Sequence, residues 1–151
     1  MKDRIALLVA AFWWGSLSTI GFLVVPMLFA RLGSPAVAGN MAGQLFAAQT
    51  WVALACGLVL LVHFRAQAGE RMDAAARTIT GWVITGLLLA LLQQYAVAPR
   101  ILARENLKLW HALGSAMYLG QWLCAAVVLW RMGRRAACSD LPDAGGPARR
   151  P

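Results

Sequence analysis

The chain has 151 residues, of which 60% are hydrophobic, and a formal net charge of +8 at pH 7. Its mean hydropathy of +0.63 fits a bundle that faces lipid, and its length leaves no room for a soluble domain beside four membrane spans. The basic residues stand singly or in small groups beside apolar runs, so the charge indicates membrane orientation and excludes nucleic acid as the expected partner.

Four long segments contain no Lys, Arg, Asp or Glu. They cover residues 5–30, 32–64, 78–99 and 109–130. Crossing a bilayer core of about 30 Å takes roughly 20 apolar helical residues, and a charge at the membrane centre costs at least about 2.5 kcal/mol on insertion scales. The pattern therefore predicts an all-α integral membrane protein, a four-helix bundle embedded in the lipid bilayer.

The first two predicted helices are joined by a short turn. The first helix is expected at about residues 5–29, bent near its outer end by Pro26, and as a retained span rather than a cleaved signal peptide. Gly33 suits a helix C-cap and Pro35 a first helical position. The second helix is therefore expected at about residues 36–63.

The last two predicted helices lie at about residues 79–98 and 109–130, and the Pro-Arg pair that follows Ala98 is expected to close the third helix. The spans together define a transmembrane domain at residues 1–132. Ser, Asp, Pro, Gly and Arg dominate the remainder, so residues 133–151 are predicted to be a disordered cytoplasmic tail.

Basic residues divide unevenly between the two sides of the predicted bundle. Ten lie at the N-terminus, between the second and third helices, or after the last span, and four lie on the opposite side. The positive-inside rule places both termini in the cytoplasm, and we expect a multi-pass protein of the bacterial cell inner membrane. The arginines of the tail are expected to contact anionic lipids.

The two halves of the chain resemble each other. Residues 26–31, Pro-Met-Leu-Phe-Ala-Arg, parallel residues 99–104, Pro-Arg-Ile-Leu-Ala-Arg, at an offset of 73. Each unit would hold two spans with the same orientation, which makes two parallel helix-hairpin repeats. Duplication and chance similarity between apolar segments both stay open as explanations.

Polar side chains gather in the predicted outer half of the bundle. They are Asn40, Gln44, Gln49, Gln93, Gln94, Tyr95, His111, Ser115, Tyr118 and Gln121. Lipid offers no hydrogen-bond partners, so these groups must find partners inside the bundle. They either bond helices to one another or line an outward-facing pocket, which we would place around His111, Ser115, Arg100, Gln44 and Tyr118.

Arg100 would bring a positive charge to such a pocket, and His111 would bring its only imidazole, which can act as a ligand, a hydrogen-bond donor or a pH sensor. Arg100 is expected where the third helix ends, within reach of the first turn of the fourth helix. An anion there would meet both the guanidinium and free backbone N–H groups. The competing interpretation pairs Arg100 with lipid headgroups and uses His111 to cap backbone groups.

Metal and cofactor chemistry has little basis in the residues. His63 and His111 are expected on opposite sides of the membrane, so one haem iron cannot bind both, and the methionines near His111 form no clustered copper(I) motif. The spans lack Asp and Glu, and phosphate-loop and hydrolase motifs are missing from the sequence. We expect no cofactor and no enzymatic activity, with a haem- or copper-binding membrane redox protein as the alternative.

Small residues recur at every fourth position on two of the helices. The two stripes are Gly39, Gly43 and Ala47, and Ala112, Ala116, Gly120 and Cys124. Stripes of this kind let helix backbones approach closely. Within one monomer each helix has few neighbouring helices against which such a stripe could pack. We therefore expect one stripe to face a second copy in a homodimer.

Two segments together resemble a known family. Pro-x-Leu-Phe at residues 26–29 precedes Leu45-Phe46 in the second helix, and Pro99-Arg100 precedes His111 and Ser115 in the fourth. The pattern resembles the domain of unknown function 4149 family, which is related to transmembrane protein 205-like proteins, over about residues 5–130.

The resemblance implies a four-span membrane protein without a settled activity. It marks Pro99, Arg100, His111 and Ser115 as the positions of interest, although members often carry a hydroxyl or an acid where this chain has Ala98. We therefore expect a non-enzymatic accessory or scaffold protein, or a component of small-solute or metal homeostasis.

Overall fold

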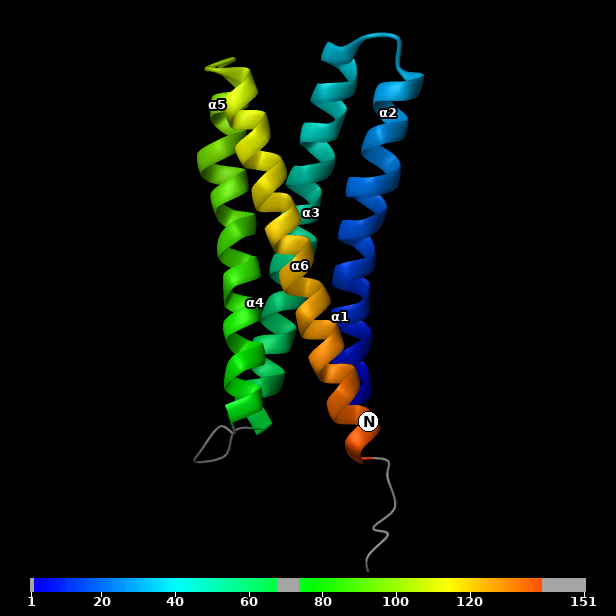
Figure 1. Cartoon of the computed structure of the whole chain (residues 1–151), viewed down its shortest axis with the longest axis vertical. Helices are drawn as coiled ribbons and strands as arrows, with labels where there is room; N and C mark the ends of the chain where they lie inside the picture. The colour runs from blue at the N-terminus through cyan, green and yellow to red at the C-terminus, as the bar shows by residue number, and fades with distance from the viewer. Residues whose placement is uncertain (1, 68–73, 140–151) are drawn as a thin grey trace, which may run out of the picture.

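The computed structural model describes residues 2–67 and 74–139, and these residues form four long rods of helix (Figure 1). All four are long and apolar enough to cross a membrane. They span Asp3–Arg31, Pro35–Gln67, Ala74–Leu102 and Leu107–Ala137. The predicted all-α four-helix bundle is thus confirmed, and the chain is a multi-pass membrane protein.

The first rod passes through its proline without a break. It consists of α1 (Lys2–Thr19), a π-helical turn η1 (Ile20–Val24) and α2 (Val25–Arg31). A proline ring clashes with the carbonyl four residues earlier. Here the backbone N–H of Val25 bonds to the Ile20 carbonyl five residues back, and the wider turn accommodates Pro26.

The third rod repeats this arrangement. It contains α4 (Ala74–Leu92), a second π-helical turn η2 (Gln93–Val97) and α5 (Ala98–Leu102). Pro99 was predicted to close the helix, and this was wrong, because the Ala98 N–H bonds to the Gln93 carbonyl and the helix continues. The two π-turns begin 73 residues apart, which is also the offset between the two similar segments.

The other two rods, α3 (Pro35–Gln67) and α6 (Leu107–Ser139), are uninterrupted α-helices of 33 residues each. The extension of α6 corrects the predicted tail, because residues 133–139 are helical. They add good helix formers such as Ala136 and Ala137 to a helix that already exists. The rest of the predicted tail, residues 140–151, lies outside the described residues.

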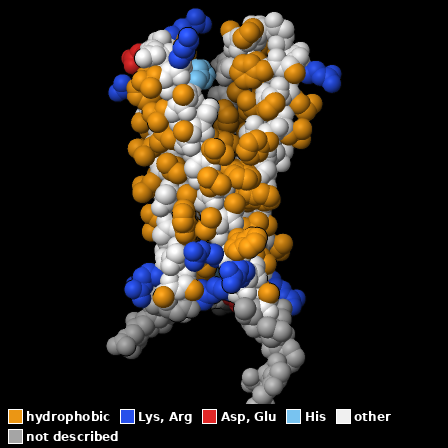
Figure 2. Space-filling model, in the orientation of Figure 1, with side chains coloured by type: hydrophobic (Ala, Val, Ile, Leu, Met, Phe, Trp, Pro, Cys, Tyr) orange, Lys and Arg blue, Asp and Glu red, His pale blue; other side chains and the backbone are white. Residues whose placement is uncertain are grey.

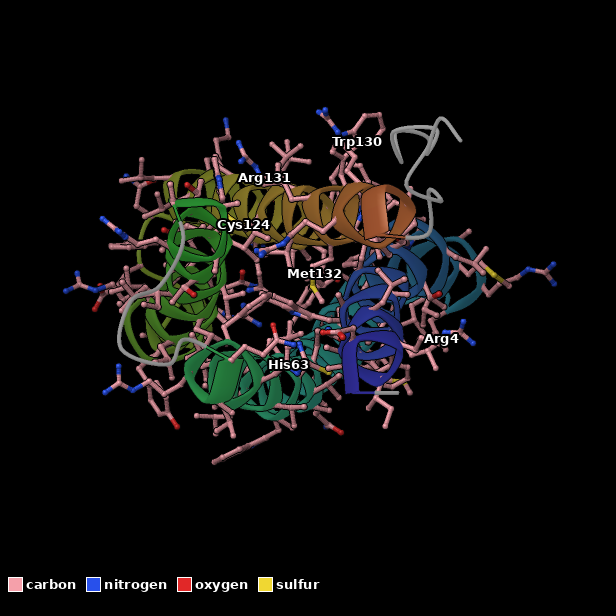
Figure 3. The ribbon with its side chains drawn as sticks, turned by 90° about the horizontal axis from the view of Figure 1, so that it is seen from below. Arg4, His63, Cys124, Trp130, Arg131 and Met132 are labelled. Carbon is pink, nitrogen blue, oxygen red and sulfur yellow. The ribbon has the colours of Figure 1, made fainter. Side chains whose placement is uncertain are left out.

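The four rods form a ring in which α1 and α4 each pack against both α3 and α6 (Figures 1 and 3). We call the end that holds Lys2, Gln67, Ala74 and Ser139 the basic end. The far end holds the turns at residues 32–34 and 103–106. Both described ends of the chain therefore lie at the basic end.

The half of the bundle toward the basic end is tightly packed. Trp13, Leu60 and Val128 are fully buried there, and Met132 and His63 point into the ring (Figure 3). A Cβ added at Gly86 would lie 2.9 Å from the Trp13 ring, so glycine is needed for α4 to approach α1. Large side chains such as Phe12, Trp51 and Trp130 are exposed on the outside, as expected for a surface in contact with lipid.

The far end is looser. Every residue of α2 and of α5, and every residue of α6 from 107 to 117, is at least partly exposed. Figure 2 shows the molecule hollowed at this end, between the two sides of the bundle.

The two small-residue stripes have different surroundings. Gly120 packs on α4, since a Cβ there would lie 3.1 Å from Leu89 Cδ1, and Cys124 is buried. A Cβ at Gly39 or Gly43 would meet no other atom of the described residues within 4 Å. The α6 stripe is therefore partly covered by α4 within the monomer, whereas no other described residue covers the α3 stripe at Gly39 and Gly43.

Candidate functional site

The last turn of α1 presents two serine hydroxyls to the other helices. Ser16 Oγ donates to the Trp13 carbonyl at 2.9 Å and accepts a hydrogen bond from Gln49 Nε2 of α3 at 2.9 Å. Ser18 Oγ donates to the Trp14 carbonyl at 2.9 Å. Serine readily bonds to a carbonyl one turn back in its own helix, and this leaves the lone pairs of Oγ for a partner on another helix.

Helix α6 bonds to the same stretch of α1. Tyr118 donates its hydroxyl to the Leu17 carbonyl at 2.8 Å, and Trp122 donates Nε1–H to Ser18 Oγ at 2.8 Å. These bonds, with that of Gln49, link α1 to both of its neighbours at a single depth. Interhelical hydrogen bonds of this kind hold membrane bundles together where no hydrophobic effect does so.

Aromatic rings surround these bonds. The Tyr118 ring meets Phe46 of α3 edge-on, with centroids 5.1 Å apart, and Trp122 lies 5.8 Å from Trp14. A Cβ at Gly21 would stand 2.5 Å from the Tyr118 ring, so only glycine leaves room for the ring at this point of η1. Tyr118 thereby joins α6 to both α1 and α3, next to the part of α6 that becomes exposed.

We call this group the polar layer. Its members are Ser16, Ser18, Gln49, Tyr118, Gln121 and Trp122. Gln49 and Gln121 are each only 2% exposed. They come from α3 and α6, which lie opposite each other in the ring. Both lie at the level of residues 16–18 of α1 along the bundle axis. Gln49 bonds to Ser16, and Gln121 lies in the sequence between Tyr118 and Trp122, which bond to Leu17 and Ser18.

Several buried polar atoms beside the polar layer lack a hydrogen-bond partner among the described residues. They are the Oε1 atoms of Gln49, Gln93 and Gln121 and the Nε1 atoms of Trp13 and Trp14. A buried polar group without a partner costs about 1–3 kcal/mol, and such groups need a specific explanation in native proteins. Gln49 and Gln121 can therefore still accept hydrogen bonds within the polar layer, and Trp13 and Trp14, one turn before Ser16 and Ser18 on α1, can donate them.

Of the five predicted site residues, Tyr118 lies in the polar layer, and the other four are exposed. His111, Ser115 and Gln44 are exposed near the far end. The described residues contain no hydrogen bond that joins any two of the five. His111 and Ser115 precede Tyr118 on the same helix, but α6 has left α1 by that point. A pocket formed by all five stays a prediction.

Arg100 is engaged locally. Its guanidinium lies 3.7 Å from the Glu105 carboxylate and 4.7 Å from the centroid of the Trp110 ring. The turn between α5 and α6 allows this because Arg104 has a positive φ of 56°, and Glu105 N–H bonds to the Arg100 carbonyl at 3.1 Å. Both charged side chains are more than half exposed, so the ion pair contributes little to stability.

The two histidines lie at opposite ends of the bundle. His63 Nε2 is 3.4 Å from the Asp3 carboxylate, which also accepts a hydrogen bond from Gln67. These contacts tie the start of α1 to the end of α3 at the basic end. His111 lies in the second turn of α6, at the far end. Within the residues that the structure describes, no three His, Cys, Asp or Glu side chains form a metal-binding group.

Sequence reasoning identified Gln49, Gln93 and Gln121 as polar but left them out of the site, and it missed Ser16 and Ser18. The signal for the two serines was present, since they are hydroxyl residues inside an uncharged span. Polar groups at such positions must find partners inside the protein. Their presence in the first helix predicts that α1 is bonded to its neighbours.

The comparisons with known proteins identify one family. The family model for the domain of unknown function DUF4149 matches residues 8–109, more than half of the chain. The match contains Ser16, Gln49 and Arg100 but ends before His111 and Ser115, so it gives no support to those two as family positions. Searches of curated proteins and of solved structures each found no match.

Proposed function

This chain belongs to the domain of unknown function 4149 family, and we propose that it is a non-enzymatic membrane protein whose polar layer binds a small uncharged polar solute. The proposal places it in the inner membrane of a bacterial cell, with both termini in the cytoplasm. It assigns the protein to small-solute homeostasis, as a binding or accessory component.

The observation that carries the proposal is Gln121. Its side chain is 2% exposed, and its Oε1 has no hydrogen-bond partner among the described residues. Gln49 also has an unpaired Oε1, but its Nε2 bonds to Ser16 and so links α3 to α1. The Gln121 side chain forms no hydrogen bond to another described residue, so it does not link helices in this way. An intramembrane polar group that does not stabilise the fold is by default a functional candidate.

The chemistry of the polar layer fits a neutral solute. The four uncharged segments contain no Lys, Arg, Asp or Glu, so an ion would meet no countercharge there and would be costly to desolvate. Glutamine carbonyls accept hydrogen bonds, and the Nε1–H groups of Trp13 and Trp14 donate them. A small molecule with both hydroxyl or amide donors and acceptors matches this set, and the aromatic rings would cover its apolar parts.

Access is expected from the far end. The hollow in Figure 2 lies on that side of the polar layer, and Tyr118 is the member of the layer that directly follows the exposed part of α6. The half of the bundle toward the basic end is closed to a solute by fully buried side chains such as Trp13 and Leu60. With the positive-inside orientation, the solute would enter from outside the cytoplasm.

Two further assignments accompany the proposal. The open α3 stripe of Gly39 and Gly43 is a candidate contact for a homodimer, since small residues let two helices approach closely. The predicted contact with anionic lipids involves Arg131, Arg134 and Arg135, which the structure describes at the end of α6, and Arg149 and Arg150, which lie outside the described residues. The haem or copper alternative is favoured by no observation, because the histidines lie at opposite ends.

Gln121→Leu tests the proposal, because leucine has a similar volume and removes the amide. We expect the purified variant to unfold at the same temperature as the natural chain or higher, since an unpaired buried acceptor is lost. We also expect it to fail to complement a deletion strain with a scorable phenotype. Asn40→Leu also replaces an amide with leucine, at an exposed position of α3 outside the five predicted site residues, and should complement.

The binding itself is measured by thermal unfolding of the natural chain with millimolar glycerol, glucose or acetamide as probes. A bound probe raises the unfolding temperature, and Gln121→Leu should abolish the rise. A marked loss of stability in Gln121→Leu would assign this glutamine to the fold. Full complementation by Gln121→Leu would contradict the proposal.

A further inference from the structure

A groove runs along the outside of the bundle between α1 and α6, toward the basic end. Leu7, Leu8 and Ala11 form its α1 side, and Leu129, Trp130 and Gly133 form most of its α6 side. The lining is almost entirely apolar, and Arg134 lies at the end nearer the membrane surface. We propose that this groove binds one anionic phospholipid, with an acyl chain along its floor and the phosphate at Arg134.

Small residues create the groove. Ala11, Gly133 and Ala137 line it, and a Cβ at Gly133 would meet no other described atom within 4 Å. Large residues form its rims, because Leu8 and Trp130 are 69% and 70% exposed. Trp130 points out of the bundle (Figure 3). An acyl chain between these rims would contact protein on two sides and not lipid alone.

Charge at the end of the groove selects the headgroup. Arg134 is exposed and forms no ion pair with another described residue, unlike Arg100 with Glu105. Arg4 lies one turn before Leu8 on the same face of α1 and points outward (Figure 3). Asp3 is the nearby acid in the sequence, and His63 and Gln67 already contact it. Two arginines without a matching acid favour a phosphate.

A second copy of the chain fits this groove less well. In a two-fold symmetric dimer the same surface lies on both sides of the contact. The arginines beside the groove, Arg4 and Arg134, would then bring four positive charges into one interface. Like charges at such short range oppose association, whereas a phosphate neutralises them.

The experiment measures lipid retention by native mass spectrometry of the full chain in mild detergent. The probes are dioleoyl phosphatidylglycerol, which is anionic, and dioleoyl phosphatidylcholine, which is not. We expect the natural chain to retain one phosphatidylglycerol per chain. Both lipids carry a phosphate, but the choline ammonium offsets its charge in phosphatidylcholine, so each arginine beside the headgroup should favour phosphatidylglycerol about fivefold.

Two variants test the two parts of the site. Gly133→Leu fills the floor and should abolish retention of phosphatidylglycerol. Arg134→Gln leaves the floor open and should reduce the preference for phosphatidylglycerol about fivefold. Gly81→Leu, at an equally open glycine on α4, and Arg31→Gln, at the far end, make the same chemical changes elsewhere and should retain the lipid.

Three results would overturn the proposal. The first is equal retention of the two lipids by the natural chain, and the second is unchanged retention of phosphatidylglycerol in a folded Gly133→Leu. The third is a loss of preference for phosphatidylglycerol in Arg31→Gln that equals the loss in Arg134→Gln. Size-exclusion chromatography establishes that each variant is folded. If Gly133→Leu does not fold, the comparison of Arg134→Gln with Arg31→Gln decides, because both change one exposed arginine.

Discussion

Tyr118 joins three helices through one side chain. Its hydroxyl donates to the Leu17 carbonyl of α1, and its ring packs on Phe46 of α3 and against Gly21. A hydroxyl in this position has no water to bond to if the interaction breaks. The chain has one other tyrosine, Tyr95, which is 65% exposed.

Replacement of Tyr118 by phenylalanine should therefore weaken the bundle. We expect Tyr118→Phe to lower the free energy of unfolding by about 0.6 kcal/mol, which is the average for an interhelical hydrogen bond in a membrane protein. The loss should not exceed about 1.7 kcal/mol, which is the largest value for such a bond. Tyr95→Phe should leave it unchanged. Unfolding in mixed detergent and dodecyl sulfate micelles measures both, and equal stability of the two variants would contradict the role given to the Tyr118 hydroxyl.

The sequence indicates which residues are polar, but it does not determine which of them are buried. Gln44 and Gln49 lie five residues apart on α3, and the first is exposed whereas the second is 2% exposed. In a water-soluble helix an apolar stripe would reveal the inward face. A membrane helix is apolar toward lipid and toward its neighbours, so its rotation follows from packing, as between Gly86 and Trp13.

The helical elements were largely predictable, because uncharged length alone defines a span. The prediction that Pro99 ends its helix was wrong, whereas the bend predicted at Pro26 stays a prediction. The π-turns η1 and η2 instead let the helices continue through Pro26 and Pro99. Their recurrence at the offset of the sequence repeat favours duplication over chance as its origin.

The close contacts between helices predict opposite effects for two glycines. Leucine at Gly120 would press on Leu89, since even a Cβ there lies 3.1 Å from Cδ1. Overpacking of this kind costs about 1–3 kcal/mol. Leucine at Gly43 meets open space, so the monomer should keep its stability.

The measurement is unfolding together with the oligomeric state in detergent. We expect Gly120→Leu to lose stability, and Gly43→Leu to stay folded but to lose the homodimer. A stable Gly120→Leu would argue against the contact between α4 and α6. An unchanged dimer in Gly43→Leu would remove the α3 stripe as its interface.

The whole molecule is a ring of four helices with its apolar side chains on the outside and its charges at the two ends (Figure 2). The number of spans follows from the sequence, and the structure agrees. The orientation follows from the count of basic residues alone, because the fold is the same whichever end faces the cytoplasm. The proposed route of the solute depends on that orientation.

Cysteine labelling in intact cells tests the four-span orientation most directly. Cys56 and Cys124 are buried, and Cys138→Ser removes the third cysteine. Ala103→Cys then places one exposed thiol at the far end, and Ala74→Cys places one at the basic end. We predict that a membrane-impermeant maleimide labels Ala103→Cys in intact cells and labels Ala74→Cys only after the membrane is opened. Labelling of Ala74→Cys in intact cells would contradict the account.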